Sequence, residues 1–145
     1  MSTIRFEVRG IPAPQGSKKA MLRRGGGHPI LLEANPRTKE WRAQVTAIAQ
    51  EHAPEKPIEG AVHVMLDFIM PRPAYLRKVP KRGPPKPPAH MTKTPDLDKL
   101  CRAIFDAITG VIILDDSQID RVFASKSYDY DDPPGVTITV IPRQS

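Results

Sequence analysis

The stretch 62–70 constrains the fold more than any other part of this chain. Its residues alternate with a period of two, and both resulting sets are largely apolar: Val62, Val64, Leu66, Phe68 and Met70 on one side, and Ala61, His63, Met65, Asp67 and Ile69 on the other. A period of two indicates a β-strand. A strand that is apolar on both faces is typical of the middle of a sheet. We therefore expect a sheet built around residues 62–70.

Other patterns predict the elements around that strand. Strands are expected at 4–8, 121–128 and 136–141, with a further short strand at 30–32 that pairs through a glycine turn at 25–27. Helical spacing of apolar residues predicts one helix that begins after Pro36 and ends before Pro54. A second helix is expected to have Thr94 as its N-cap and Pro95 at its first position, and to end at Gly110.

The resulting order is strand, strand, helix, strand, helix, strand, strand. This order predicts an α+β fold: one mixed, mostly antiparallel sheet with two helices packed on one face. The 145 residues suit a single domain spanning 1–145. Within it, residues 71–93 are expected to form an irregular, extended loop, because seven prolines lie between Pro71 and Pro88.

Charge points to a polyanionic partner. The chain has a net charge of +6 and a pI near 9.7, so it attracts nucleic acid. The segment 71–93 contains no acidic residue, and the segment 10–27 is also basic. The candidate DNA-binding residues in these two segments are Lys18, Lys19, Arg23, Arg24, Arg72, Lys81, Arg82, Lys86 and Lys93.

Several classes of protein are disfavoured. The single cysteine, Cys101, excludes an internal disulfide and a multi-cysteine zinc site, and it falls on an apolar helix stripe, where a core role is expected. The four histidines show no zinc-like spacing. The N-terminus lacks a signal core, and no stretch has the length of a membrane span, so we expect a cytoplasmic protein.

Two acidic segments stand out against this basic background. Asp96-Leu97-Asp98 begins the second predicted helix, and Asp115-Asp116 follows a short apolar run at 111–114. Carboxylates near a phosphate ligand repel it unless they hold a divalent cation, which polarises phosphate and activates water. This combination favours a metal-dependent nuclease.

Helix geometry limits how these carboxylates can cooperate. Residues two apart on an ideal helix point about 200° from each other, so Asp96 and Asp98 share an ion only if Asp96 lies before the helix, on extended backbone. Asp106 lies ~12 Å farther along the axis than Asp98. We leave it out of the site and expect it to support a neighbouring basic side chain.

Ordinary explanations also exist for each acidic segment. Asp96 and Asp98 could complement the helix dipole, and Asp115-Asp116 could form a solvated turn. A non-catalytic basic nucleic-acid-binding module therefore stays open as an alternative. A metal nuclease for unbranched DNA or RNA is the third possibility.

One family carries the same motifs. The sequence Pro95-Asp96-Leu97-Asp98-Lys99-Leu100, then Phe105-Asp106-Ala107-Ile108, then Leu114-Asp115-Asp116-Ser117-Gln118-Ile119, resembles the signature of RusA-type Holliday junction resolvases. The family pattern is D-L-D-N-L, a helix containing F-D-A-L, and L-D-D-A-Q-V. The similarity is close and specific over residues 95–122 and weaker outside them.

The resemblance implies a Mg²⁺-dependent homodimer, often phage- or prophage-encoded, that acts in DNA recombination and repair. Such an enzyme resolves four-way DNA junctions by paired symmetric nicks. The resemblance assigns metal binding to Asp96, Asp98 and Asp116, with Asp115 a less certain ligand. The dimer interface is not defined by the sequence: the run 111–114 and the second face of 62–70 are candidates, although core packing explains both equally simply.

The chain departs from the family pattern at two positions. Lys99 stands where the family has asparagine, and Arg102 stands where it has a catalytic lysine. Arginine holds phosphate and stabilises negative charge, but it does not donate a proton near neutral pH. Lys99 is the alternative group, although it projects about 100° away from Asp98 on an ideal helix.

Overall fold

The fold is built on one four-stranded sheet. The computed structural model describes residues 2–16, 19–21, 30–32 and 36–143. Its strands lie in the order β1 (Ile4–Arg9), β6 (Gly135–Pro142), β4 (Val62–Met70) and β5 (Ile119–Tyr128). β6 is antiparallel to both of its neighbours, whereas β4 and β5 run parallel. The predicted mixed sheet, with 62–70 as a central strand, is confirmed.

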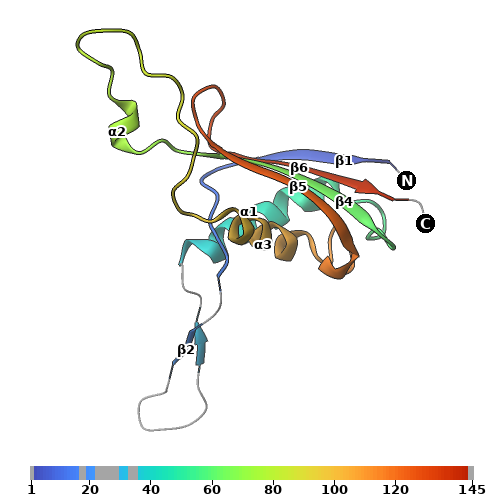
Figure 1. The fold of residues 1–145 in the computed structure, drawn as a ribbon. Coiled ribbons are helices and arrows are strands. Elements are labelled where there is room, and N and C mark those ends of the chain that lie inside the picture. Colours follow the sequence, from blue (N-terminus) through green and yellow to red (C-terminus); the bar gives the residue numbers. More distant parts are fainter. Residues whose placement is uncertain (1, 17–18, 22–29, 33–35, 144–145) are drawn as a thin grey trace.

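The core lies between this sheet and two helices, α1 (Arg37–His52) and α3 (Leu97–Ile108). Both helices pack on the same face of the sheet (Figure 1). Val64, Leu66 and Phe68 are fully buried beneath them, and on α3 the residues Leu100, Ile104 and Ile108 are fully buried as well. The predicted α+β arrangement is therefore confirmed, and its apolar stripes form one continuous core.

The start of α3 differs from the prediction. Thr94 is not the N-cap and Pro95 is not helical, because the helix begins at Leu97 with Asp96 as its N-cap. The first helical bond runs from the Leu100 amide to the Asp96 carbonyl. The Pro95 carbonyl instead accepts the Lys126 ammonium of β5 at 2.9 Å.

Residues 71–93 form a long excursion from the sheet, which we call the arm (Figure 1). The expectation that its prolines forbid regular structure is wrong at one point, because the short helix α2 (Ala74–Arg77) lies within it. A second, small core anchors the arm: Met91 packs with Met70 and Tyr128 from the ends of β4 and β5. Apart from α2 the arm contains no helix or strand, and it is fastened to the sheet at both ends.

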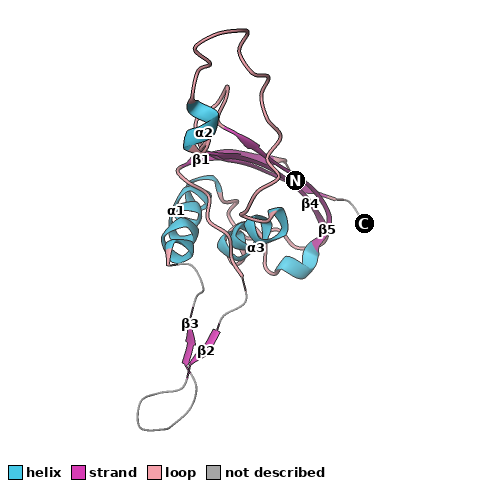
Figure 2. Ribbon diagram, turned by 60° about the vertical axis from the view of Figure 1, so that its left-hand side comes forward, coloured by secondary structure: helices cyan, strands magenta, loops and turns pink. Residues whose placement is uncertain are grey.

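A two-stranded hairpin lies apart from the body. β3 (Ile30–Leu32) is the predicted short strand, and it pairs antiparallel with β2 (Lys19–Met21), a strand that was not predicted. The predicted glycine turn at 25–27 lies outside the described residues. The hairpin and the arm lie at opposite ends of the molecule (Figure 2). None of the helices in the described part of the chain combines the length and apolarity needed to cross a lipid bilayer.

Candidate active site

The first acidic segment sits where the chain enters α3. Asp96 has extended backbone angles (φ −68°, ψ 141°) and its carboxylate makes no cap hydrogen bond, while Asp98 lies in the first helical turn. Both side chains are exposed. Asp96 therefore lies before the helix, as a shared ligand role requires, and the usual capping explanation does not account for its carboxylate.

Lys126 of β5 binds the backbone just before this segment. Its ammonium donates to the carbonyl of Lys93 at 2.8 Å as well as to that of Pro95. Two charge-assisted bonds from one strand residue set the course of the chain immediately before Asp96. Sequence reasoning missed Lys126, because a lysine within a predicted strand carries no signal that it binds carbonyls more than 30 residues away.

The cationic side chains on α3 lie close to these aspartates. The Lys99 ammonium is 3.4 Å from the Asp96 carboxylate, in an exposed (i, i+3) ion pair. Arg102 is exposed one helical turn after Asp98. Cys101 is buried, and burial together with the negative charge of Asp98 raises the pKa of its thiol to about 11. The thiol stays protonated, in agreement with its predicted core role.

The second acidic segment forms a single 3₁₀ turn, η1 (Asp116–Gln118), before β5. The Asp115 carboxylate accepts the Ser117 amide at 3.0 Å. The Ser117 hydroxyl, and after it this amide, lower the pKa of Asp115. The capping explanation therefore holds for Asp115. It does not extend to Asp116, which is exposed at the start of the turn.

Gln118 fixes the turn that carries Asp116. Its amide oxygen accepts the Leu114 and Asp115 amides at 2.7 and 2.8 Å. Its amide nitrogen donates to the carbonyls of Ile58 and Gly60 at 2.7 and 2.8 Å. All four bonding positions that an amide side chain offers are used. Sequence reasoning placed Gln118 only in the family motif and did not foresee this role.

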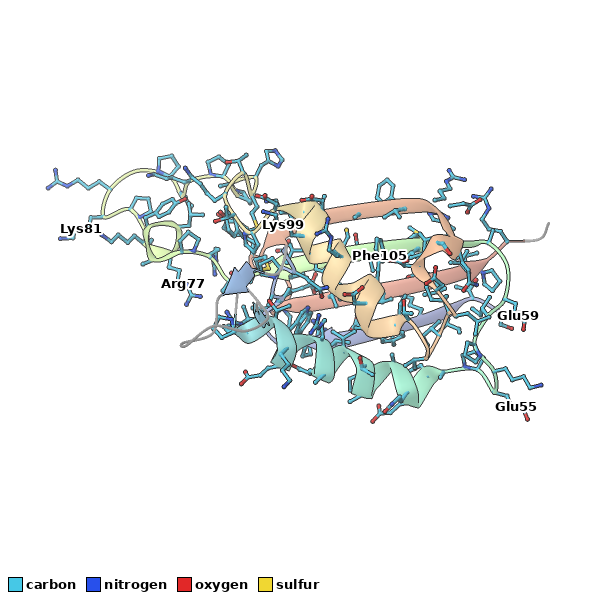
Figure 3. All side chains as sticks on the ribbon, turned by 90° about the horizontal axis from the view of Figure 1, so that it is seen from below. Glu55, Glu59, Arg77, Lys81, Lys99 and Phe105 are labelled. Carbon is cyan, nitrogen blue, oxygen red and sulfur yellow. The ribbon has the colours of Figure 1, made fainter. Side chains whose placement is uncertain are left out.

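One chain does not bring the two acidic segments together. Lys99, near the start of α3, lies toward the arm, whereas Glu59 lies at the far end of the sheet (Figure 3), and Gln118 binds the residues on either side of Glu59. The seven-residue step from Ile119 to Lys126 along β5 spans roughly 23 Å. Within the described residues, no three His, Cys, Asp or Glu side chains are grouped so that they could hold a metal ion.

Asp106 has the supporting role that was expected of it. Its carboxylate lies 3.8 Å from the Arg42 guanidinium and accepts the Gln15 amide. Arg42 also donates to the Gln15 oxygen at 2.7 Å. This cluster fastens the segment after β1 to both α1 and α3.

The predicted DNA-binding residues fall into three groups. Lys81, Arg82, Lys86 and Lys93 are exposed on the arm. Arg72 turns inward instead, pairing with Asp129 at 3.0 Å and stacking 4.7 Å from the centre of the Tyr130 ring. The remaining residues cannot be placed as side chains: Lys19 lies in β2, where only the backbone is described, and Lys18, Arg23 and Arg24 lie outside the described residues.

The two candidate dimer surfaces also differ. Ile112 and Ile113 are fully buried, so most of the run 111–114 is core. The second face of β4 is on the side of the sheet that the helices leave uncovered, and Met65 and Ile69 there are half-buried. Phe123, on the neighbouring strand β5, is 62% exposed.

Together these features define a small basic α+β protein that presents exposed aspartates from two rigidly held segments. Residues 12–141 match the family described as "Endodeoxyribonuclease RusA". The chain belongs to this RusA endodeoxyribonuclease family, which identifies it as a phosphodiester hydrolase of the Holliday junction resolving class. It is also 30% identical over 130 residues to "Uncharacterized protein YqaN" of Bacillus subtilis (strain 168), a match that covers 88% of this chain and 89% of that protein.

Proposed function

We propose that this protein resolves four-way DNA junctions by paired symmetric nicks in a Mg²⁺-dependent reaction, in DNA recombination and repair in the cytoplasm. The observation that carries the proposal is the set of exposed carboxylates at Asp96, Asp98 and Asp116. Lys126 binds the backbone just before Asp96 and Asp98. Gln118 and the capping bond of Asp115 hold the turn that carries Asp116. Carboxylate oxygens are the ligands that Mg²⁺ prefers.

The separation of the segments leads us to propose that two copies complete each metal site. Asp96 and Asp98 of one copy would meet Asp116 of the other. Within one chain the two acidic segments lie roughly 20 Å apart, so their carboxylates cannot bind the same ion, whose ligands lie at ~2.1 Å. A four-way junction has two-fold symmetry, and a C2 dimer supplies two equivalent sites. The uncovered sheet face that includes Phe123 is the surface we propose for this dimer.

The chain's own residues would do the remaining work. The ion, when bound, supplies a water of lowered pKa and neutralises developing negative charge. Arg102 and Lys99 lie beside Asp96 and Asp98 and are placed to hold the phosphate. The exposed cations of the arm would bind neighbouring phosphates, which fixes the position of the DNA without reading its sequence.

The first experiment measures nicking of a synthetic four-way junction and a matched duplex, with Mg²⁺ or EDTA. We expect Mg²⁺-dependent nicking of the junction, and a loss of about 1,000-fold in Asp98→Asn. Salt-sensitive binding without nicking, unaffected by Mg²⁺, would indicate the non-catalytic module. Equal cutting of junction and duplex would indicate a general metal nuclease.

A second experiment tests whether two copies share each site. Asp98→Asn and Asp116→Asn chains are unfolded together, refolded as a mixture and assayed. If sites are shared, a mixed dimer contains one intact site, and the mixture recovers roughly a quarter of the wild-type sites. If each site lies within one chain, every site in the mixture carries a substitution and nicking stays at the level of the single variants.

A further inference from the structure

A cavity lies beside the first acidic segment, and nothing in the proposed reaction uses it. It has a volume of about 560 Å³. Met70 and Tyr128, the paired last residues of β4 and β5, both line it, so it opens at the carboxyl ends of the two parallel strands. Crevices at such strand ends are common ligand sites. We call this cavity the strand-end pocket.

The walls combine apolar surface with cations. Met70, Met91 and Tyr128 are buried and supply the apolar part, while Arg37 and Lys93 supply positive charge. Every lining residue belongs to the described part of the chain, and none of them is acidic. Such walls suit a ligand that has a flat apolar portion and carries negative charge.

Tyr75 adds an aromatic ring to the pocket. It lines the pocket and is 59% exposed. Burial raises the pKa of Tyr128, and its neighbours Tyr75 and Tyr130 raise it further, so the hydroxyl stays protonated near neutral pH. The pocket therefore offers an accessible ring for stacking and a neutral group for hydrogen bonding.

The pocket adjoins the candidate metal ligands along the chain. Thr94 and Pro95 form part of its wall, and Asp96 is the next residue, one Cα step of about 3.8 Å away. Successive nucleotides of one duplex strand rise by about 3.4 Å along the helix axis, and an unstacked strand is longer per nucleotide. A DNA strand with a phosphate at Asp96 therefore has a neighbouring base within reach of the pocket.

We propose that the strand-end pocket receives one unstacked base of the DNA strand whose phosphate lies at Asp96 and Asp98. The inference rests on the proposed function and adds a substrate subsite to it. Bases near a branch point are the least firmly stacked, and exposed bases stack on aromatic side chains whatever their identity. The cationic rim contacts the flanking phosphates.

The test is a double-mutant cycle between Tyr75 and the DNA. Junctions carry an abasic site at each nucleotide near the branch point in turn, and the dissociation constant is measured in EDTA, so that no strand is cut. With the wild-type chain, we expect one abasic position to weaken binding about 5- to 100-fold. Tyr75→Ala should weaken binding to the intact junction similarly and should show no further loss at that position.

Tyr75→Phe is the matched control, because it keeps the ring and removes only the hydroxyl. It should retain most of the dependence on the base. Since Tyr75 is largely exposed, neither substitution removes core packing. Thermal unfolding of both variants checks that the fold is intact.

The outcomes separate this inference from the proposed function. Nicking by the wild-type chain without coupling between Tyr75 and any base overturns the pocket assignment alone. Coupling without nicking supports the base site in a binding protein and overturns the nuclease mechanism. If Tyr75→Ala changes the sedimentation coefficient of the free protein and no base is coupled, a second copy occupies the pocket and the inference is wrong.

Discussion

The two acidic segments look alike in sequence but are built in different ways. In the first, Lys126 ties down the backbone ahead of Asp96, and no backbone amide caps its carboxylate. In the second, Asp115 turns its carboxylate onto the backbone, and Gln118 fastens the turn so that Asp116 faces solvent. One segment is held by a cation from a neighbouring strand, the other by a neutral amide and an internal cap.

The difference shows that the hydrogen-bond partners of a carboxylate indicate whether it stabilises the fold or is available to bind a cation. Asp115 and Asp116 are adjacent, yet the Ser117 amide holds the first and no comparable bond is made by the second among the described residues. A capped aspartate has part of its charge satisfied by an amide dipole. An uncapped one keeps its full capacity for a cation. Substitutions at the two positions should therefore have very different consequences.

The largest effect is expected for Asp116→Asn. Replacing one ligand oxygen with an amide removes a negative charge from the proposed metal site, and junction nicking should fall about 1,000-fold. The side chain is exposed, so the free energy of unfolding should change by less than about 0.5 kcal/mol. Single-turnover nicking and urea unfolding measure the two quantities. Wild-type nicking by this variant would remove Asp116 from the mechanism.

Gln118→Leu should have the next largest effect, and it should act on both stability and activity. The substitution leaves two carbonyls and two amides without their present partner. We expect a loss of about 2 kcal/mol in the free energy of unfolding and a fall in nicking of about 100-fold, as for other residues that orient metal ligands. If the variant keeps wild-type nicking activity at a Mg²⁺ concentration that limits the wild type, the hydrogen bonds of Gln118 are not needed to position Asp116.

Lys126→Met tests the fastening of the other segment. The carbonyls of Lys93 and Pro95 lose their donor, and the chain before Asp96 gains freedom to extend the helix backwards. Nicking should fall about 10-fold, and the Mg²⁺ concentration for half-maximal nicking should rise by a similar factor. Lys126→Arg keeps a cation that donates to carbonyls and should recover most of the activity. Equal losses in both variants would mean that Lys126 does more than position the segment.

Local patterns predicted the elements well, because each pattern reports the burial of its own residues. The alternation at 62–70 identified β4 as a central strand, and the apolar stripe that ends before Pro54 identified α1. One error lies at a long-range contact. α3 begins two residues later than predicted. At that point the Pro95 carbonyl is bonded to Lys126 of β5, a contact that no local pattern contains.

The arrangement of the site was less predictable than the fold. Asp98 and Asp116 are close in sequence, yet one chain does not bring them together. The twelve residues of α3 separate its ends by about 18 Å, and the turn at Asp116 is fastened beside Ile58 and Gly60 instead. Residue types and spacing indicated which carboxylates to consider, whereas the rigid elements between them determine how far apart they lie.

The smallest effect is expected for Asp115→Asn. Asparagine caps a helical turn about as well as aspartate, and its side-chain oxygen can still accept the Ser117 amide. Near neutral pH, nicking should therefore stay within about 3-fold of wild type. Together with the large loss of nicking expected in Asp116→Asn, this result would assign different roles to two adjacent carboxylates.

The same substitution has a pH signature that activity alone does not provide. The Ser117 hydroxyl and amide lower the pKa of Asp115 in the folded chain. A group with a lowered folded pKa adds stability above its unfolded pKa, and the contribution disappears as the pH falls through the folded pKa. Urea midpoints of the wild-type chain should therefore decline in acid more than those of Asp115→Asn, which has no proton to bind there. Parallel pH profiles for the two chains would show that the Asp115 charge does not stabilise the turn, and the contrast with Asp116 would then rest on activity alone.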